Sequence, residues 1–206
     1  MIKAIFFDFD GVLTREFNGS GNICKNLCKA IPSLSYDSVM NCYRKHCGRL
    51  LVETGTYSDV EENFCECIGL QIPSEVYKDA QITNTRNDEM FALVESLRGN
   101  YMLGIITDNS EERMNLIDDQ MQLSNLFKTI VISSVAHALK HDGTTSIFDT
   151  AISSIQCNPE ECIFIDNQER NLTIPKQMGM KTYWHDDKKN DVSALKAKLE
   201  EWGVVL

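Results

Sequence analysis

Two aspartates near the amino end, Asp8 and Asp10, have the spacing that places both carboxylates on one side of an extended chain. Gly11 follows them and permits a sharp turn away from that side. Two carboxylates held this close repel each other, which either raises the pKa of one of them or recruits a cation. The first outcome supplies a proton donor and the second a magnesium site. Both suit phosphoryl transfer, in which one carboxylate attacks and the other protonates the leaving oxygen.

Further polar residues follow other apolar runs of the chain. The segment from Thr107 to Ser110 ends one such run, Asp166 and Asn167 end another, and Lys140 follows a third. Each of them alone could be ordinary loop chemistry, because Asp, Asn and Ser are common turn residues. Ligands of open α/β sheets bind beyond the carboxyl ends of the strands. The joint appearance of these residues at successive strand ends therefore predicts one shared site.

Five short apolar runs are typical of strands buried on both faces. They span residues 2–7, 101–106, 129–133, 162–165 and 181–184. Helical apolar stripes lie between or after them, at Met90, Leu93, Val94 and Leu97, at Ile147, Phe148, Ala151, Ile152 and Ile155, and at Leu195, Leu199 and Trp202. This alternation indicates an α/β fold with a parallel sheet covered on both faces.

The segment 15–87 breaks that alternation and shows helical patterns only. The expected helices span residues 22–30, 36–52, 60–69 and 74–80, and Ser58 with Glu61 suggests a capping box at the third of them. The predicted organisation is a core domain of residues 1–14 and 88–206, with a helical cap domain of residues 15–87 inserted after the first strand.

The composition limits the partners. The chain of 206 residues has 20 Lys and Arg against 30 Asp and Glu, a net charge of −10. This balance argues against nucleic-acid and anionic-membrane partners, which are bound through Lys and Arg. No apolar stretch has the length of a membrane span, and the amino end lacks a signal-peptide pattern, so the default location is the cytoplasm.

The eight cysteines give no clear metal pattern. Six fall between Cys24 and Cys67, but their spacings are irregular for zinc, and disulfides are not expected without an export signal. Cys24, Leu27, Cys28 and Ile31 follow helical spacing, which indicates small buried thiols on a core face.

Three segments together resemble the haloacid dehalogenase (HAD) superfamily. Residues 8–14, Asp-Phe-Asp-Gly-Val-Leu-Thr, are similar to its motif I, residues 103–109 to its motif II, and residues 163–171 to its motif IV. The resemblance covers the whole chain and implies a Rossmann-like parallel-sheet core with a helical cap of the C1 type. It implies a phosphatase that needs Mg²⁺ and hydrolyses a small phosphorylated metabolite.

The resemblance also implies roles for individual residues. Asp8 would be the nucleophile that forms an aspartyl-phosphate, and Asp10 would protonate the leaving alcohol and then activate water. Thr107, Asp108 and Lys140 would contact the substrate, with Lys140 balancing the charge of Asp8 and the phosphate. Mg²⁺ would bind Asp8, the Asp10 carbonyl and the acidic end of motif IV.

Two departures from the family pattern leave alternatives open. Lys140 is followed by His141 where the family commonly has proline, so a solvated surface lysine is the competing interpretation. The usual motif IV metal position falls on Asn167, an uncharged ligand, with Asp166 directly before it, and either could serve. A phosphomutase and a binding or regulatory protein with a degraded site are the alternative functions.

The remaining candidates are weaker. His141 is interpreted as a loop residue that could reach a substrate, His185 as solvated, and Tyr183 with Trp184 as strand packing. Arg15, Glu16 and Asn18 are candidates near the entrance of the cap.

Overall fold

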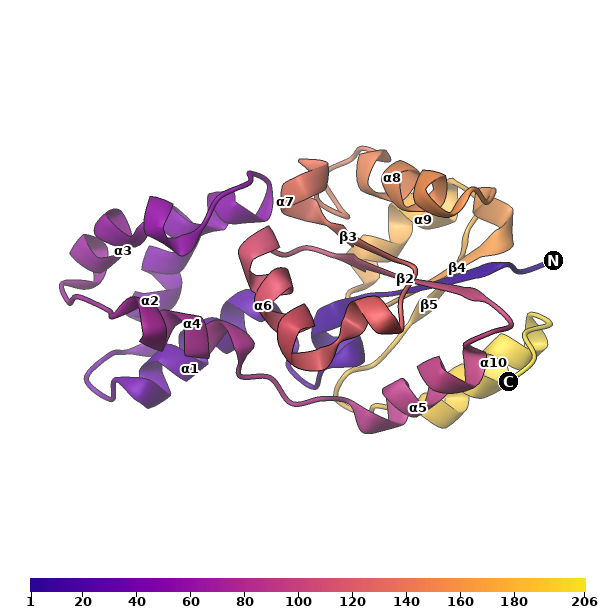
Figure 1. The fold of residues 1–206 in the computed structure, drawn as a ribbon, viewed down its shortest axis with the longest axis horizontal. Helices are drawn as coiled ribbons and strands as arrows, with labels where there is room; N and C mark the ends of the chain where they lie inside the picture. The colour runs from indigo at the N-terminus through magenta and orange to yellow at the C-terminus, as the bar shows by residue number, and fades with distance from the viewer.

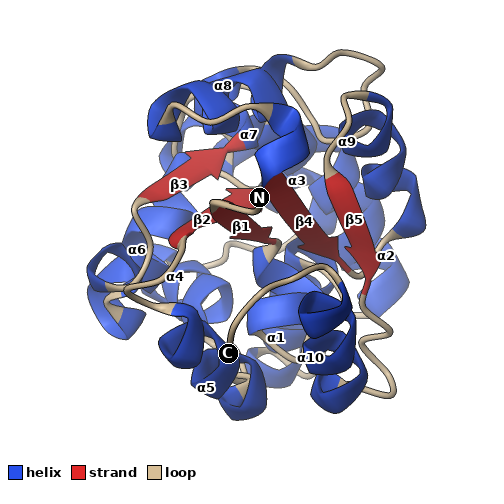
Figure 2. Ribbon diagram, turned by 90° about the vertical axis from the view of Figure 1, so that its right-hand side faces the viewer, coloured by secondary structure: helices blue, strands red, loops and turns tan.

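A parallel sheet forms the centre of the computed structural model, which describes residues 1–206. Its five strands lie in the order β3-β2-β1-β4-β5, as Figure 2 shows. They are β1 Ala4–Phe7, β2 Met102–Thr107, β3 Thr129–Ile132, β4 Cys162–Asp166 and β5 Lys181–Trp184. Every neighbouring pair is parallel, so the carboxyl ends of all strands meet at one edge. The predicted α/β fold with a Rossmann-like sheet is confirmed.

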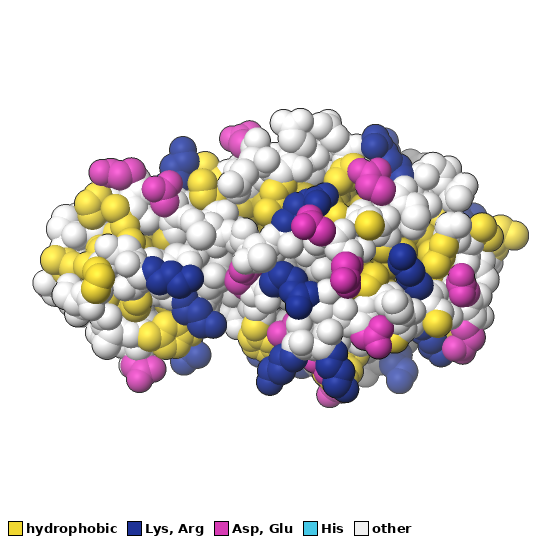
Figure 3. All heavy atoms as spheres, turned by 90° about the horizontal axis from the view of Figure 1, so that it is seen from below, with side chains coloured by type: hydrophobic (Ala, Val, Ile, Leu, Met, Phe, Trp, Pro, Cys, Tyr) yellow, Lys and Arg dark blue, Asp and Glu magenta, His cyan; other side chains and the backbone are white.

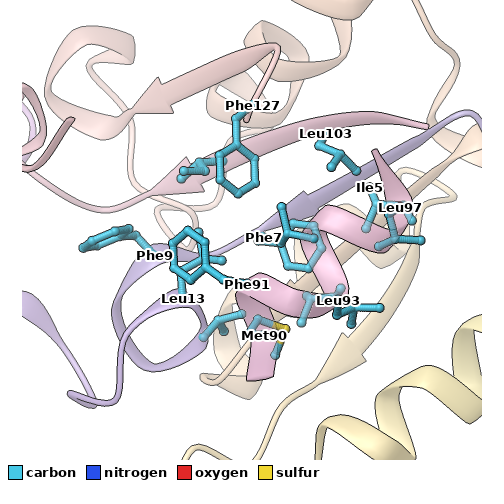
Figure 4. Close-up of a cluster of buried hydrophobic side chains, with 14 of the residues drawn as sticks. Ile5, Phe7, Phe9, Leu13, Met90, Phe91, Leu93, Leu97, Leu103 and Phe127 are labelled. Carbon is cyan, nitrogen blue, oxygen red and sulfur yellow. The ribbon is translucent and has the colours of Figure 1, made fainter. Parts of the chain in front are cut away.

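Helices cover both faces of the sheet, and β1 supplies side chains to each face. Ile5 and Phe7 belong to the cluster formed with α5 (Asp88–Leu97) and α10 (Val192–Glu201), whereas Ala4 and Phe6 belong to the cluster formed with α8 (Ser146–Ile155). In Figure 4 the side chains of Ile5 and Phe7 lie against those of Leu93 and Leu97 from α5. The core helices are α5 Asp88–Leu97, α6 Glu111–Met121, α7 Ser133–Ala136, α8 Ser146–Ile155, α9 Thr173–Gln177 and α10 Val192–Glu201. Burial on both faces explains why β1 is an unbroken apolar run.

Four helices form a separate group at one end of the molecule, opposite the two termini (Figure 1). They are α1 Gly19–Ala30, α2 Tyr36–Cys42, α3 Glu61–Ile68 and α4 Ser74–Ile82. This group, called the cap below, has its own hydrophobic cluster of 16 buried residues. Cys24 and Leu27 are fully buried in that cluster, as their helical spacing predicts.

The cap differs locally from the sequence expectations. The helix expected over 36–52 is α-helical only as far as Cys42. One wide π turn and a 3-10 turn follow it, with Gly48 at their junction. Glycine is a poor helix former, which accounts for the change from the π turn to the 3-10 turn at Gly48. The capping box lies at Thr56 and Asp59, two residues before the predicted pair.

Cys42 and Cys67 form a disulfide, contrary to the expectation of free thiols throughout. Helices α2 and α3 pack side by side, which brings the Cα atoms of the two residues within 5.8 Å of each other. A pairing across 25 residues depends on this packing, and the irregular cysteine spacing gives no sign of it.

The two chain segments that join cap and core run side by side. Thr14 and Arg86 form an antiparallel bridge, and the Arg15 amide donates to the Thr85 carbonyl over 2.9 Å. The predicted domain boundaries at 14/15 and 87/88 lie on these two segments and stay predictions. No helix combines the length and the apolar character that crossing a bilayer requires.

Candidate active site

Asp8 and Asp10 lie where β1 ends, in a tight turn that Gly11 closes with a φ of +84°. Both carboxylates are nearly buried, with 3% and 5% of their residues exposed. A side chain at position 11 would collide with the Asn167 amide, so close packing and backbone conformation both require glycine there. Both aspartates line one small cavity of about 30 Å³, together with Thr107, Asp108 and Lys140 among others.

Lys140 is buried beside the first aspartate, so the solvated-surface interpretation is wrong. Its Nζ lies 2.8 Å from Oδ1 of Asp8 and 2.7 Å from Oδ2 of Asp166, and only 1% of its side chain is exposed. Although burial opposes it, the carboxylates of Asp166 and Asp8 raise the pKa of Lys140. The ammonium is therefore a fixed positive charge beneath the site.

The two oxygens of the Asp8 carboxylate have different surroundings. Oδ1 accepts a hydrogen bond from the Phe9 amide at 2.7 Å and forms the ion pair with Lys140, whereas Oδ2 accepts no hydrogen bond from the protein. Burial, followed by the charge of Asp166, raises the pKa of Asp8 well above its usual range, and Lys140 opposes that shift. Oδ2 is thus the oxygen that is free to contact a bound group.

The end of β2 contributes hydrogen-bond donors to the same cavity. The Thr107 hydroxyl oxygen accepts a 2.7 Å hydrogen bond from Nδ2 of Asn109, which leaves its own proton free to donate. Asp108 accepts from the Lys140 amide at 3.0 Å and lies 3.6 Å from the His141 ring. Burial opposes the shift, but its contacts with His141 and Lys140 lower the pKa of Asp108.

At the end of β4, the two motif IV candidates have separate environments. The oxygens of the Asp166 carboxylate already accept from Lys140, from the Gln168 amide at 2.7 Å and from Nδ2 of Asn171 at 3.0 Å. Asn167 donates through Nδ2 to the Phe17 carbonyl, and its Oδ1 is buried without any donor. A buried carbonyl oxygen without a partner is unfavourable unless something binds it.

The donor set can be tested against Mg²⁺, which prefers oxygen ligands and usually takes only one or two carboxylates from a protein. No group of three or more His, Cys, Asp or Glu side chains suits a metal ion. Asn167 lines the adjoining cleft, and its partnerless Oδ1 together with the Asp8 carboxylate would offer such an ion one neutral ligand and one charged one. The residues present therefore fit Mg²⁺, with less negative charge than two carboxylates would supply.

Arg113, which the sequence reasoning missed, lies against the second aspartate. Its Nη1 and Nη2 donate to the two oxygens of Asp10 over 2.7 and 2.8 Å. Burial opposes it, but the Asp10 carboxylate raises the pKa of the Arg113 guanidinium. The two residues are 103 positions apart. The only sequence signal is that Arg113 follows Asn109 by one helical turn, just after the second strand end.

A larger cleft of about 880 Å³ opens next to this cavity, between cap and core. It shares Asn18, Gly19, Asp108 and Gln168 with the small cavity. Arg44 from the cap and Arg170 from the core line it, and neither forms an ion pair with the protein. Elsewhere, charges of both signs are interspersed, as the lower face in Figure 3 shows. The unpaired guanidiniums are therefore available to a ligand in the cleft.

Trp184 lines the cleft as well and corrects the expectation of simple strand packing. It is 46% exposed, and its Nε1 donates to the Asn167 carbonyl over 2.9 Å. The reason is its place at the last position of the edge strand β5, where one side faces the cleft. Tyr183, in contrast, packs partly buried against the core.

His185 is buried, with 1% exposed, and not solvated as expected. Its amide donates to the Asp166 carbonyl and extends the strand pairing, which carries the ring inside, where Nε2 lies 3.1 Å from Oδ1 of Asn190. Burial lowers the pKa of His185. His141 does line the cleft.

The three candidates near the cap entrance lie in different parts of the structure. Asn18 lines the cleft and caps α1 by accepting from the Gly21 amide over 2.7 Å. Glu16 accepts from the Thr85 amide at the junction of cap and core. Arg15 lines a separate surface hollow and not the cleft.

Comparison with known proteins places this geometry in a family. The model of the haloacid dehalogenase-like hydrolases matches residues 5–185. The chain therefore belongs to the haloacid dehalogenase-like hydrolase family. No curated protein matches the sequence.

Solved structures share the fold at low sequence identity. A predicted HAD-like hydrolase from Porphyromonas gingivalis is 21% identical over 97% of this chain and 98% of its own, with a TM-score of 0.78. A HAD family enzyme from Bacteroides thetaiotaomicron, solved with magnesium and inorganic phosphate, is 15% identical over 94% and 99%, with a TM-score of 0.74. L-2-haloacid dehalogenase from Xanthobacter autotrophicus, solved with covalently bound chloropropionic acid, is 13% identical over 100% and 85%, with a TM-score of 0.68.

Proposed function

We propose that this hydrolase is a magnesium-dependent phosphatase that acts on a small phosphate monoester through an aspartyl-phosphate. The observation that carries the proposal is the Asp8 carboxylate. One oxygen is held by Lys140 and the Phe9 amide, and the other is free in a cavity that Asp10 and Thr107 also line. A fixed carboxylate with one free oxygen is what nucleophilic attack on phosphorus requires.

In the first half of the reaction, Oδ2 of Asp8 forms a bond to phosphorus and the ester P–O bond breaks. Asp10 gives a proton to the departing oxygen, so the leaving group departs as a neutral alcohol. In the second half, Asp10 takes a proton from water, the water oxygen bonds to phosphorus, and the bond to Asp8 breaks to release phosphate. Lys140 and the free Thr107 proton stabilise the phosphoryl oxygens throughout.

For Mg²⁺, we propose the Asp8 carboxylate, the Asp10 carbonyl and Oδ1 of Asn167 as ligands. The bound ion supplies positive charge that stabilises the phosphoryl group. Asp166 is the less suitable ligand because its oxygens are already engaged by Lys140, Gln168 and Asn171. Its role is to hold the Lys140 ammonium in place.

Asp10 favours phosphatase over dehalogenase chemistry. Family dehalogenases resemble this pattern but lack the second carboxylate of motif I, because a halide leaves without a proton. The volume of the cleft suits a small-molecule leaving group. The unpaired Arg44 and Arg170 favour a leaving group that carries negative or polar groups.

The test is phosphate release from a panel of sugar phosphates, phosphoglycolate and nucleotides, with magnesium and with chelator. Wild-type protein is expected to release phosphate only with magnesium, and Asp8→Asn to abolish turnover because the amide is a poor nucleophile. Asp79→Asn is the matched control, since this exposed cap carboxylate removes the same charge away from the cleft.

Four outcomes would contradict the proposal. Turnover in Asp8→Asn equal to wild type would remove the nucleophile, and equal rates in chelator would remove the metal. Chloride release from 2-chloropropionate without phosphate release from any ester would indicate a dehalogenase. A strict requirement for a sugar bisphosphate would indicate a phosphomutase.

A further inference from the structure

Arg113 connects the second aspartate of the site to the cap. We propose that it is a positioning residue that fixes the Asp10 carboxylate and makes its orientation depend on how the cap is seated. This inference rests on the proposed phosphatase function, in which Asp10 must face the leaving oxygen.

Arg113 is buried, with 1% of the residue exposed, and every N–H of its guanidinium has an acceptor. On the core side, Nη1 donates to Oδ2 of Asp10 at 2.7 Å and to Oδ1 of Asn109 at 2.5 Å, and Nη2 donates to Oδ1 of Asp10 at 2.8 Å. On the cap side, Nε donates to the Gln81 carbonyl at 3.1 Å and Nη2 to Oδ1 of Asn84 at 2.9 Å. A planar fork with no spare donor has a single orientation that satisfies all its partners.

The cap-side partners belong to the segment through which the chain returns to the core. Gln81 lies in α4, and Asn84 follows that helix. Nδ2 of Asn22 from α1 also donates to Oδ1 of Asn84, over 3.0 Å. Gly19 of α1 lies so near that an added Cβ would meet Nη1 of Arg113 at 2.5 Å and Oδ2 of Asp10 at 2.9 Å. The ion pair is therefore enclosed by the cap on two sides.

Both oxygens of Asp10 are held in this arrangement. Oδ1 accepts from Arg113, and Oδ2 accepts from Arg113 and from Nδ2 of Asn109 at 2.9 Å. Oδ1 accepts only this one bond, so its second lone pair is left to exchange a proton with a leaving group, and the guanidinium sets the direction in which that oxygen points. A shift of the cap that moves Gln81 or Asn84 must either carry the guanidinium with it or break these bonds.

Stability alone gives no reason to retain such a pair, because apolar residues often replace buried ion pairs at no cost. The other contacts between cap and core are simpler. The Ser133 hydroxyl donates to the Leu51 carbonyl, and the Tyr57 amide donates to Glu112. Asn167, the proposed magnesium ligand, also donates to the Phe17 carbonyl, but none of these bonds reaches Asp10. Only Arg113 joins the cap to the proposed acid and base.

The test uses the dependence of turnover on leaving-group acidity, which reports proton donation by Asp10. Phenyl and p-nitrophenyl phosphate have similar shapes, but only the weaker acid, phenol, needs a proton to leave. Arg113→Met is expected to lower kcat for phenyl phosphate about tenfold more than for p-nitrophenyl phosphate, with KM nearly unchanged. Arg113→Lys should recover part of this difference. Arg98→Met, an exposed arginine of the core, is the matched control.

A double-mutant cycle separates positioning from structural support. In an Asp10→Asn background, Arg113→Met is expected to leave the ratio of the two kcat values unchanged, because the residue through which it acts is gone. Asn84→Ala, which removes only a cap-side contact, should shift the ratio in the same direction by about threefold. Circular dichroism verifies that each variant is folded, and if Arg113→Met is not, Arg113→Lys and Asn84→Ala carry the test.

Failure of the inference is distinguishable from failure of the proposed function. Wild-type protein that hydrolyses neither ester with magnesium would overturn both. An active wild type whose kcat ratio is unchanged in the folded Arg113 variants would overturn the positioning role alone. An unchanged ratio in Asn84→Ala would overturn the dependence on the cap.

Discussion

Replacing Lys140 by methionine tests whether its ammonium compensates the two carboxylates beside it. The substitution keeps most of the length of the unbranched side chain and removes its terminal ammonium, with the charge and the donors. Asp8 and Asp166, which the ammonium contacts at 2.8 and 2.7 Å, would then lie together in a buried region without a positive partner.

The expected loss of unfolding free energy at pH 7.5 is about 3–5 kcal/mol, the cost of removing one partner of a buried ion pair. The loss should shrink as the pH falls. Lys140 opposes the raised pKa of Asp8 in the wild type, so without it that pKa rises further above its unfolded value and the folded variant binds more protons than the folded wild type. The free energy of unfolding of the variant therefore rises relative to that of the wild type as the pH falls. The rise is about 1.4 kcal/mol for each pH unit over which the folded variant holds one proton more than the folded wild type.

The assay is urea unfolding followed by circular dichroism at pH 7.5 and 5.5. Adding Asp166→Asn to the Lys140→Met variant should recover part of the loss, because it removes one of the two repelling charges. Lys128→Met, an exposed lysine without an ion pair, is the matched control. A loss below about 1 kcal/mol, as for a surface pair, that does not change with pH would refute the reasoning.

Three further predictions concern other parts of the molecule. Asn167→Asp should retain turnover and bind Mg²⁺ about tenfold more tightly in calorimetric titration, since it adds a negative ligand; unchanged affinity would exclude this position as a ligand. Because burial lowers the pKa of His185, the unfolded chain binds more protons below about pH 6.5, so unfolding free energy should fall there on acidification. His185→Gln should flatten that slope in urea unfolding, and an equal slope would contradict the burial argument. Iodoacetamide should label the partly exposed Cys28 and Cys157 before Cys24, whose burial raises the pKa of its thiol to about 12; peptide mapping that finds equal rates would contradict this order.

The elements whose apolar residues recur at a regular spacing were predictable from the sequence. The five apolar runs are the five strands, and the stripe at Met90, Leu93, Val94 and Leu97 is fully buried. The position of polar residues at strand ends also predicted which side chains would share one edge of the sheet. Asp8, Asp10, Thr107, Asp108 and Lys140 do line a single cavity.

The remaining features depend on packing between segments that no local pattern connects. The disulfide of Cys42 and Cys67 requires α2 and α3 to lie side by side, and the burial of His185 depends on the turn after the edge strand. Arg113 reaches Asp10 from a helix that the sequence places far away. Charged residues are usually exposed, so a buried arginine gives no signal before its partners are known.

The pairing of the two segments between cap and core has a consequence for how this scaffold can diversify. Because the chain leaves the core at Thr14 and rejoins it beside that point at Arg86, the whole helical group is topologically a single loop insertion. A segment inserted in this way can be exchanged or remodelled without altering the order of the strands. Under the proposed function, leaving-group preference can change through this insertion while the sheet edge that carries Asp8 and Asp10 stays as it is, with Arg113 as the point where the two must remain compatible.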